Sequence, residues 1–420
     1  MTQSLKTKDG PVWQDGRAIA LMMAATLMVM ANATISPALA GLERAFMGQT
    51  NADFLIRLLV PAPSLTVVIF APLAGYFVDR YGRRVMLLFG VVLFVITGSA
   101  GFYLPNLEMI FTSRLALGIA VAMIMTSQTA LIGDYFTGEK RSALTGLQIS
   151  ARNFGGFVFL TLAGWFAVSS PRLPFVIYGL AVLYLPFMWM VIRETSGTPA
   201  KETIKNTAKN RVIESVIKTE ASEADGHLSW KGWIAALAVL QLMTNMIFFL
   251  MPTQLPFFLD SLGYDSAVMT GAALGALSLA GGCAALFYSR IKRVLNYAGT
   301  YALGYGFMAL GFAILPLGTD VIAIFAGSVA VGIGFALAVP NFVGIALQIA
   351  PSSRRGMAGG VLTTAVFLGQ FCSPFLSIPS ITSFGYNITY QGAALLLGTV
   401  ALMAALKRGV EVLKLRMKEI

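Results

Sequence analysis

Charged residues are scarce in this chain. Of its 420 residues only 12% are Asp, Glu, Lys or Arg, whereas a soluble domain carries about 25%. Histidine occurs once and cysteine twice, and their spacing predicts neither a metal site nor a disulfide framework. No paired acids, histidine cluster or nucleophile motif indicates an enzyme, and no motif predicts a cofactor. These absences exclude an ordinary soluble domain and leave no chemistry that would need a metal or a prosthetic group.

Apolar residues take the place of the missing charges. Hydrophobic residues make up 57% of the chain, and the mean hydropathy is +0.75. Apolar runs of about 18 residues or more recur, which is the pattern of membrane-spanning helices. We therefore expect an all-α integral membrane protein with twelve transmembrane helices. The expected spans are 18–40, 54–77, 84–103, 107–133, 143–167, 174–192, 232–258, 267–288, 295–316, 320–347, 357–379 and 386–406.

The few charges predict how these spans are oriented. With the amino terminus in the cytoplasm, all but five of the 30 Lys and Arg residues fall on the cytoplasmic side. The five exceptions are Arg44, Arg57, Arg114, Arg152 and Arg172. The external ends instead carry acids, which are Glu43, Asp53, Glu108, Asp260, Asp265 and Asp320. The pattern places both termini in the cytoplasm and the protein in the cell inner (plasma) membrane, and it explains the net charge of +11 without a nucleic-acid partner.

One long polar stretch divides the chain into two halves of six spans. The expected parts are an amino-terminal six-helix bundle, a cytoplasmic linker and a carboxy-terminal six-helix bundle, at residues 1–192, 193–231 and 232–420. The halves echo each other, because Asn32 precedes Pro37 in the first span as Asn245 precedes Pro252 in the seventh. Repeated halves predict two bundles with a site between them near the middle of the membrane. We expect the protein to be a monomer in the lipid bilayer.

The stretch GYFVDRYGRR, residues 75–84, lies between the second and third expected spans and has the form G-x-x-x-D-R-x-G-R-R. In this position it closely resembles the signature loop of the major facilitator superfamily of membrane transporters. The pattern is matched at Gly75, Asp79, Arg80, Gly82, Arg83 and Arg84. A glycine at position 75 would let another helix approach closely, and one at position 82 would permit the tight turn.

The resemblance implies a gate on the cytoplasmic side. Asp79 would contact the start of the eleventh span and latch the outward-open state, and Asp134 at the inner end of the fourth span would pair with Arg83. The expected gating residues are Gly75, Asp79, Arg80, Gly82, Arg83 and Asp134. The alternative is that the arginines only set the orientation of the chain. The corresponding stretch of the second half, SRIKRV (289–294), has Ser289 in place of the acid, so the latch should rest on the first half.

Two arginines lie well inside the expected spans. Arg114 and Gly118 form the R-x-x-x-G core of a motif that resembles one found in proton-coupled members of the superfamily, including drug:proton antiporters. Residues 146–166 lack the Gly-Pro pair that such antiporters carry in the fifth span, and Arg152 stands where an apolar or small residue would be expected. Each arginine could bind an anionic substrate or a coupling group, or it could cap backbone carbonyls at a broken helix. Arg114 could also extend to the external headgroups.

No acidic residue or histidine lies near the centre of any expected span. Because arginine does not deprotonate in proteins, proton coupling would need a carboxylate at the mouth of the pathway, such as Glu43 or Asp53. Amides could line the pathway or join helices by hydrogen bonds, and Asn32, Asn245 and Asn341 are the main candidates. We expect a secondary transporter that exports a small organic or amphiphilic compound by alternating access. The alternative is uptake or facilitated transport of an organic anion, such as a carboxylate metabolite or a siderophore.

Overall fold

The computed structural model describes residues 11–49, 51–194, 230–317 and 320–416, and these residues are almost entirely helical. The helices before residue 195 are α1 (Gly16–Ala33), α2 (Leu39–Ala45), α3 (Ala52–Leu59), α4 (Ala62–Tyr81), α5 (Arg83–Ser99), α6 (Leu107–Tyr135), α7 (Gly138–Ser169), the 3-10 segment η4 (Leu173–Leu183) and α8 (Tyr184–Val191). The helices after residue 229 are α10 (Trp230–Phe248), α11 (Leu250–Ser261), α12 (Ser266–Ile314), α13 (Val321–Ile349) and α14 (Arg355–Arg416). Residues 195–229, most of the predicted linker, lie outside the described residues.

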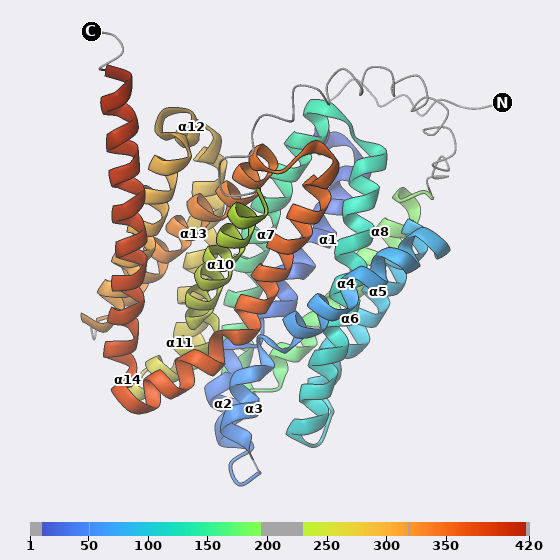
Figure 1. Ribbon diagram of the computed structural model, residues 1–420. Helices are drawn as coiled ribbons and strands as arrows, with labels where there is room; N and C mark the ends of the chain where they lie inside the picture. The colour runs from blue at the N-terminus through green and yellow to red at the C-terminus, as the bar shows by residue number, and fades with distance from the viewer. Residues whose placement is uncertain (1–10, 50, 195–229, 318–319, 417–420) are drawn as a thin grey trace, which may run out of the picture.

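Within the described ranges, ten helical segments are long and apolar enough to cross a membrane. Two of them are 52 and 56 residues long, which is more than twice the ~20 residues that one crossing needs. The chain reverses inside both, at Asn296 (φ 54°) in α12 and at Gly385 (φ 79°) in α14, as Figure 1 shows. These reversals lie at or beside the gaps that the sequence predicted after the eighth and eleventh spans.

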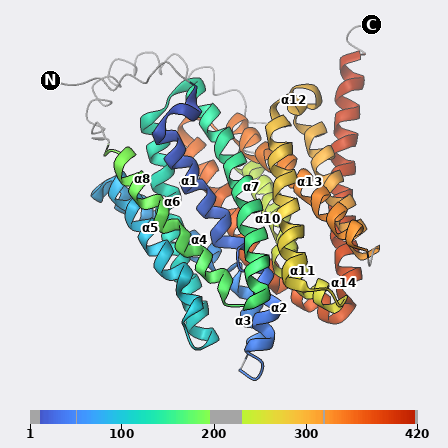
Figure 2. The ribbon, with the colours of Figure 1, turned by 180° about the vertical axis from the view of Figure 1, so that it is seen from behind.

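The helices form two groups that share a central layer. In Figures 1 and 2, α4, α5, α6 and α8 lie on one side, α12, α13 and the last part of α14 lie on the other, and α1, α7 and α10 lie between them. The start of α1 and the end of α14 are at the same end of the molecule. We call this end, which also holds Gly82 and the start of α14, the basic end. The opposite end holds α2, α3 and α11.

Proline breaks the first and the seventh expected spans at equivalent places. Because proline has no N–H, it cannot bond to the carbonyl four residues earlier in a helix. That carbonyl belongs to Ala33 for Pro37 and to Phe248 for Pro252, and these residues are the last ones of α1 and α10. The hydroxyl of Ser36 donates a hydrogen bond to the carbonyl of Pro252. The two breaks, 216 residues apart in sequence, therefore meet inside the molecule.

Glycines let α7 lie directly against its neighbours. A Cβ on Gly164 would lie 2.9 Å from the Cα of Gly271 in α12, and a Cβ on Gly155 would lie 2.9 Å from Thr26 in α1. Both distances are too short for a side chain, so only glycine allows this packing. The central helix α7 is thus held between α1 of the first half and α12 of the second.

Candidate functional site

At the opposite end, charged and aromatic side chains join the two halves. Arg44 of α2 forms an ion pair with Asp260 of α11, at 3.4 Å. Arg57 of α3 pairs with Glu43 at 3.5 Å, and its guanidinium lies 4.5 Å from the ring centre of Phe257 in α11. The sequence placed these charges at external helix ends but did not pair them. The one indication of this pairing in the sequence was that charges of opposite sign lie at the external ends of the first, second and seventh expected spans.

At the basic end, the turn of the signature loop has the geometry that its glycine predicted. Gly82 has φ 97°, and a Cβ there would lie 2.9 Å from the carboxylate of Glu194. That carboxylate accepts hydrogen bonds from the backbone N–H groups of Arg83 (2.8 Å) and Arg84 (3.0 Å), at the start of α5. An acid at a helix amino terminus satisfies free N–H groups and the helix dipole. Sequence reasoning missed Glu194, whose signal was its place beside the predicted end of the sixth span.

The basic residues of the loop have distinct contacts. Arg83 forms the ion pair with Asp134 that the resemblance implied. Arg84 donates to the carbonyl of Trp189 in α8 at 2.8 Å, and its guanidinium lies 4.6 Å from the centre of that ring. Arg80 is exposed and donates to the hydroxyl of Tyr76 at 2.8 Å. The loop is therefore anchored to α6 and α8, both within the first half.

Asp79 is exposed, and the described residues give it no hydrogen bond or ion pair. It forms no hydrogen bond or ion pair with the described start of α14 in this conformation, so its gating role stays a prediction about another state. One expectation for Gly75 is wrong here. A Cβ on Gly75 would meet only Thr126 of α6, at 4.0 Å, which is ordinary contact, so the packing at this position does not require glycine.

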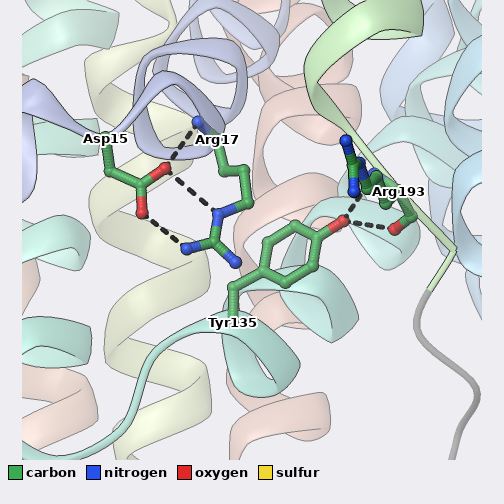
Figure 3. A network of polar contacts seen from close by, with 4 residues as sticks. All are labelled: Asp15, Arg17, Tyr135 and Arg193. Carbon is green, nitrogen blue, oxygen red and sulfur yellow. Dashed lines mark hydrogen bonds and ion pairs between the residues drawn. The ribbon is translucent and has the colours of Figure 1, made fainter. Parts of the chain in front are cut away.

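A second polar network ties α1 to α6 and α8 at the basic end (Figure 3). Asp15 caps α1 through the backbone N–H of Arg17 (2.9 Å) and also pairs with the Arg17 guanidinium. That guanidinium lies 5.0 Å from the ring centre of Tyr135, whose hydroxyl bonds to the backbone of Arg193. Partial burial opposes ionisation, but the hydrogen bonds and charge of Arg17 prevail and hold the pKa of Asp15 below its usual value.

Arg114 is fully buried in α6 and acts on backbone carbonyls. Its Nε donates to the carbonyl of Leu59 at 3.1 Å, and a terminal nitrogen donates to the carbonyl of Ala31. The helical partner of the Leu59 carbonyl would be the N–H of residue 63, which is a proline, so the arginine replaces a missing donor. The guanidinium also lies 5.0 Å from the ring centre of Tyr178. The structure thus favours carbonyl capping, and extension to the headgroups is wrong because the side chain has no exposed surface.

Gly118 explains the spacing of the R-x-x-x-G motif. It lies one turn after Arg114 on the same face of α6, and a Cβ there would overlap the hydroxyl of Thr66 and the carbonyl of Pro63. The missing side chain lets α4 lie against α6, and the hydroxyl of Thr66 donates to the carbonyl of Leu115 at 2.7 Å. This close approach brings the end of α3 within reach of Arg114.

Arg152 has a different environment near the middle of α7. Its Nε is buried and has no hydrogen-bond partner, and the same holds for the Nε2 of Gln148, one turn earlier on the same face. Gly156, one turn later on this face, lies against Val29 of α1 and Ser278 of α12. Among the described residues no acid pairs with Arg152. Two side chains with free donors therefore lie where α1, α7 and α12 meet.

The three asparagines differ in their contacts. Asn32 donates to the side-chain carbonyl of Gln370 in α14 at 3.3 Å, and the hydroxyl of Ser64 donates to the same oxygen at 2.7 Å. Asn341 is fully buried and accepts a hydrogen bond from the hydroxyl of Tyr288 at 2.8 Å. These two asparagines therefore join helices, which was the alternative that the sequence left open.

Asn245 is also fully buried, but its bond stays within α10. Its Nδ2 donates to the carbonyl of Gln241 at 2.8 Å, and its Oδ1 has no partner.

Within the described part of the chain, no group of three His, Cys, Asp or Glu side chains is placed to hold a metal ion.

Comparison with known proteins gives the family. The model of the Major Facilitator Superfamily matches residues 21–374. The chain belongs to the major facilitator superfamily. It is therefore a multi-pass transporter of the plasma membrane and not an enzyme. The membership in this superfamily that the 75–84 loop predicted is confirmed.

The similar proteins include curated transporters and solved structures. The chain is 23% identical to the quinolone resistance protein NorA of Staphylococcus aureus (strain COL) over 336 residues, which is 79% of this chain and 81% of that protein. It is 32% identical to multidrug resistance protein 1 of Bacillus subtilis (strain 168) over 143 residues, which is 34% of this chain and 37% of that protein. The fold matches the crystal structure of a D-xylose–proton symporter with a TM-score of 0.72 at 16% identity, covering 91% of this chain and 96% of the other.

Proposed function

We propose that this member of the superfamily exports a small organic or amphiphilic compound across the plasma membrane by alternating access. The similarity to two proteins named for drug resistance, one of them over 79% of this chain, supports the outward direction. In this proposal the chain crosses the membrane twelve times, with the basic end in the cytoplasm because positive charges stay on that side. Two six-helix bundles, 1–192 and 232–420, are joined by the linker 193–231 and move against each other.

The observation that carries alternating access is the difference between the two ends. At the opposite end, Arg44 pairs with Asp260 and Arg57 lies on the ring of Phe257, so the two halves are joined. At the basic end Asp79 has no partner among the described residues. This arrangement fits a state that takes up substrate from the cytoplasm. The outward-open state would break the first set of contacts and bring Asp79 to the start of α14.

The gate of this proposal consists of the signature loop and its partner on α6. Gly82 sets the turn, the ion pair between Arg83 and Asp134 fixes the loop to the first half, and Asp79 is then held ready for the second half. Arg80 and Gly75 complete the loop at its exposed side. The second half lacks an acid at the corresponding place, Ser289, so closure at the basic end depends on Asp79.

The proposed substrate site lies around Arg152. The Nε of Arg152 and the Nε2 of Gln148, neither of which has a hydrogen-bond partner, offer donors at the middle of α7. On the neighbouring helix α1, the side-chain carbonyl oxygen of Asn32 is also without a partner. Arg114 is not part of this site but stabilises it, because it donates a hydrogen bond to the carbonyl of Ala31 near the end of α1. Asn245 contributes a second free carbonyl oxygen from α10. A ligand with an acceptor group that faces Arg152 and an apolar body would suit these side chains.

Among the acids at the mouth of the pathway, Glu43 has the contacts that suit a proton-coupling group. Glu43 pairs with Arg57 inside the cluster that joins the two halves, whereas Asp53 is exposed and accepts from Arg57 only through its backbone carbonyl. Protonation of Glu43 would release Arg57 and weaken this cluster. Coupling would then act on the opening of the opposite end.

A second candidate function is transport of an organic anion. The observation that favours it is the unpaired guanidinium of Arg152, because a half-buried cation without a counter-charge gains from an anionic ligand. Carboxylates and phosphates match the geometry of arginine donors. The two functions differ in the charge of the substrate and share the same site.

The test is transport by purified protein in proteoliposomes that hold a proton gradient. The probes are a fluorescent quinolone, the cation ethidium and the anion carboxyfluorescein, each measured in both directions. Gradient-driven movement of the quinolone or ethidium toward the extracellular side supports export. Movement of carboxyfluorescein alone supports the anion transporter, and failure of all three probes, with intact protein in the vesicles, would contradict the proposed substrate class.

The matched variants are Arg152→Gln and Arg172→Gln. Arg172 lies at the opposite end and donates to the carbonyl of Leu104 at 2.7 Å, so its loss leaves the proposed site unchanged. Arg152→Gln should slow transport of the active probe by about tenfold or more, since a charged hydrogen bond contributes roughly 1.5–3 kcal/mol. Equal rates in the two variants would remove Arg152 from the substrate site.

A further inference from the structure

A basic cavity lies between the first turns of α10 and α14, away from the proposed substrate site. It has a volume of about 450 Å³. The residues that line it are Trp230, Lys231, Pro351, Ser353, Arg354 and Met357. Both helices begin at the basic end, so the cavity lies at the membrane surface where α10 and α14 enter the hydrocarbon region.

The packing of the two helices explains why these residues meet. The helices run in the same direction, and the hydroxyl of Ser373 donates to the carbonyl of Met246 at 2.7 Å. Gly369 and Leu242 are separated by the same number of residues as Ser373 and Met246, and the glycine lets the two backbones touch there. At the start of the two helices, the residues with this same separation are Met357 and Trp230, so these two side chains are expected to lie side by side. The close packing of the later turns thus gives way to a cavity at the first turn.

The charged side chains among the described residues that line the cavity are all basic. Lys231 and Arg354 are both exposed, and the described part of the chain gives neither an ion pair nor a hydrogen bond. Arg355 follows directly, and it is also exposed and unpaired within those residues. Lysine and arginine bind phosphate by charge-assisted hydrogen bonds, and the hydroxyl of Ser353 adds a further donor. The cavity therefore suits a phosphate group.

Apolar side chains continue from this cavity along the membrane-facing surface. Met357 is 48% exposed and Trp233, one turn after Trp230, is 49% exposed. Tryptophan is enriched at the level of lipid headgroups, where its ring lies on apolar chains and its N–H reaches the polar layer. A free phosphate ion would leave these side chains uncovered, whereas the acyl chains of a phospholipid would cover them.

We propose that the cavity between α10 and α14 binds the phosphate headgroup of an anionic phospholipid. Lys231 and Arg354 hold the phosphate, Ser353 donates to it, and the acyl chains lie along Met357 and Trp233. Juxtamembrane basic residues attract anionic lipid, and basic pockets between spans bind phosphate headgroups. The site is separate from Arg152 and does not depend on the substrate that is transported.

Lipid binding to the delipidated full-length protein, measured by native mass spectrometry, tests the proposal. The ligands are phosphatidylglycerol, phosphatidylcholine with the same acyl chains, and inorganic phosphate as a competitor. We expect phosphatidylglycerol to be retained preferentially and millimolar inorganic phosphate to displace little of it. Equal retention of both lipids would overturn the proposal, and full displacement by inorganic phosphate would assign the site to the free ion instead.

The variant pair is Lys231→Gln with Arg354→Gln, and its matched control is Arg290→Gln with Arg293→Gln. The control removes two exposed cations from the turn region of α12 at the same end. The first pair should weaken phosphatidylglycerol binding by about tenfold or more, and the control should change it by less than about twofold. Equal losses in both pairs would indicate a diffuse charge effect and overturn the site.

A second measurement locates the lipid. Phosphatidylglycerol with brominated acyl chains should quench tryptophan fluorescence, and the variant Trp230→Phe combined with Trp233→Phe should lose most of the quenching that exceeds that of brominated phosphatidylcholine. Retention of this excess quenching in the double variant would show that the lipid binds elsewhere. The measurement remains informative if the charge variants express poorly, because neither tryptophan change removes a charge.

Discussion

Arg114→Gln should destabilise the protein, whereas Arg152→Gln should not. The guanidinium of Arg114 donates to two buried carbonyls, those of Leu59 and Ala31. Each hydrogen bond from a charged donor contributes roughly 1.5–3 kcal/mol, so about 3–6 kcal/mol is at stake. Glutamine is shorter and can reach only one of the two carbonyls. We therefore expect a net loss of about 2–5 kcal/mol in the free energy of unfolding.

The assay is thermal unfolding of the detergent-purified protein, followed by tryptophan fluorescence. At roughly 2 °C per kcal/mol for a large domain, the midpoint of Arg114→Gln should fall by about 4–10 °C. The midpoint of Arg152→Gln should stay constant or rise, because the change removes a cation whose buried Nε has no partner. Arg172→Gln is the control with a single carbonyl contact, for which the same conversion gives an expected loss of about 3–6 °C.

Two results would refute this reasoning. An unchanged midpoint for Arg114→Gln, together with abolished transport, would show that Arg114 acts in the pathway and does not cap the broken helices. A large fall in the midpoint of Arg152→Gln would show that Arg152 has structural contacts that its surroundings do not display. Either outcome would reverse the roles assigned to the two arginines.

Four further predictions concern packing, gating and pH. Gly118→Ala should lower the unfolding midpoint by several degrees, because its Cβ would overlap a backbone carbonyl of α4; a midpoint within about 1 °C of the parent protein would contradict that packing. Asp79→Asn should increase labelling of cysteines engineered at the basic end by a membrane-impermeant thiol reagent, and an unchanged pattern would reject the latch. Exchange of Arg44 and Asp260 as a double charge swap should restore transport that either single reversal reduces; no rescue would mean that their pair is not used in the cycle. The pKa of Asp15 is lowered below its usual 3.8, so the stabilisation from its pair with Arg17 is complete above that pH and is lost as the pH falls through the lowered pKa. The variant Asp15→Asn should therefore lose less stability on acidification than the parent protein. An identical dependence of stability on acidic pH in the two proteins would contradict the role of the pair.

Local features of the fold could be predicted from the sequence because their causes lie in neighbouring residues. Pro37 and Pro252 each remove one N–H, and the helices stop at the carbonyls that lose their partner. Gly82 has the positive φ that the tight turn needs. Likewise, the long apolar runs indicated the spans, and the chain reverses at Gly385 inside one of the predicted gaps.

Partners across the fold could not be predicted in the same way. Glu194 caps α5 from more than 100 residues away, and Asn32 meets Gln370 across the two halves. Gly75 looked like a packing glycine, but a Cβ there would make only an ordinary contact with Thr126 of α6. Such contacts depend on the rotation and tilt of each helix, and a sequence pattern does not specify these angles.

The two arginines inside the spans show what the sequence could predict and what it could not. The sequence by itself determined that both lie inside apolar spans, where a cation needs a partner or a cavity. Its loop at 75–84 predicted the family, which the match over residues 21–374 confirms. Only the tertiary structure decided that Arg114 donates hydrogen bonds to backbone carbonyls at the ends of broken helices, whereas the Nε of Arg152 has no hydrogen-bond partner. The physical reason is that a carbonyl becomes a partner only when helix packing brings it within hydrogen-bond distance. For Arg114, the glycine one turn away allows that approach.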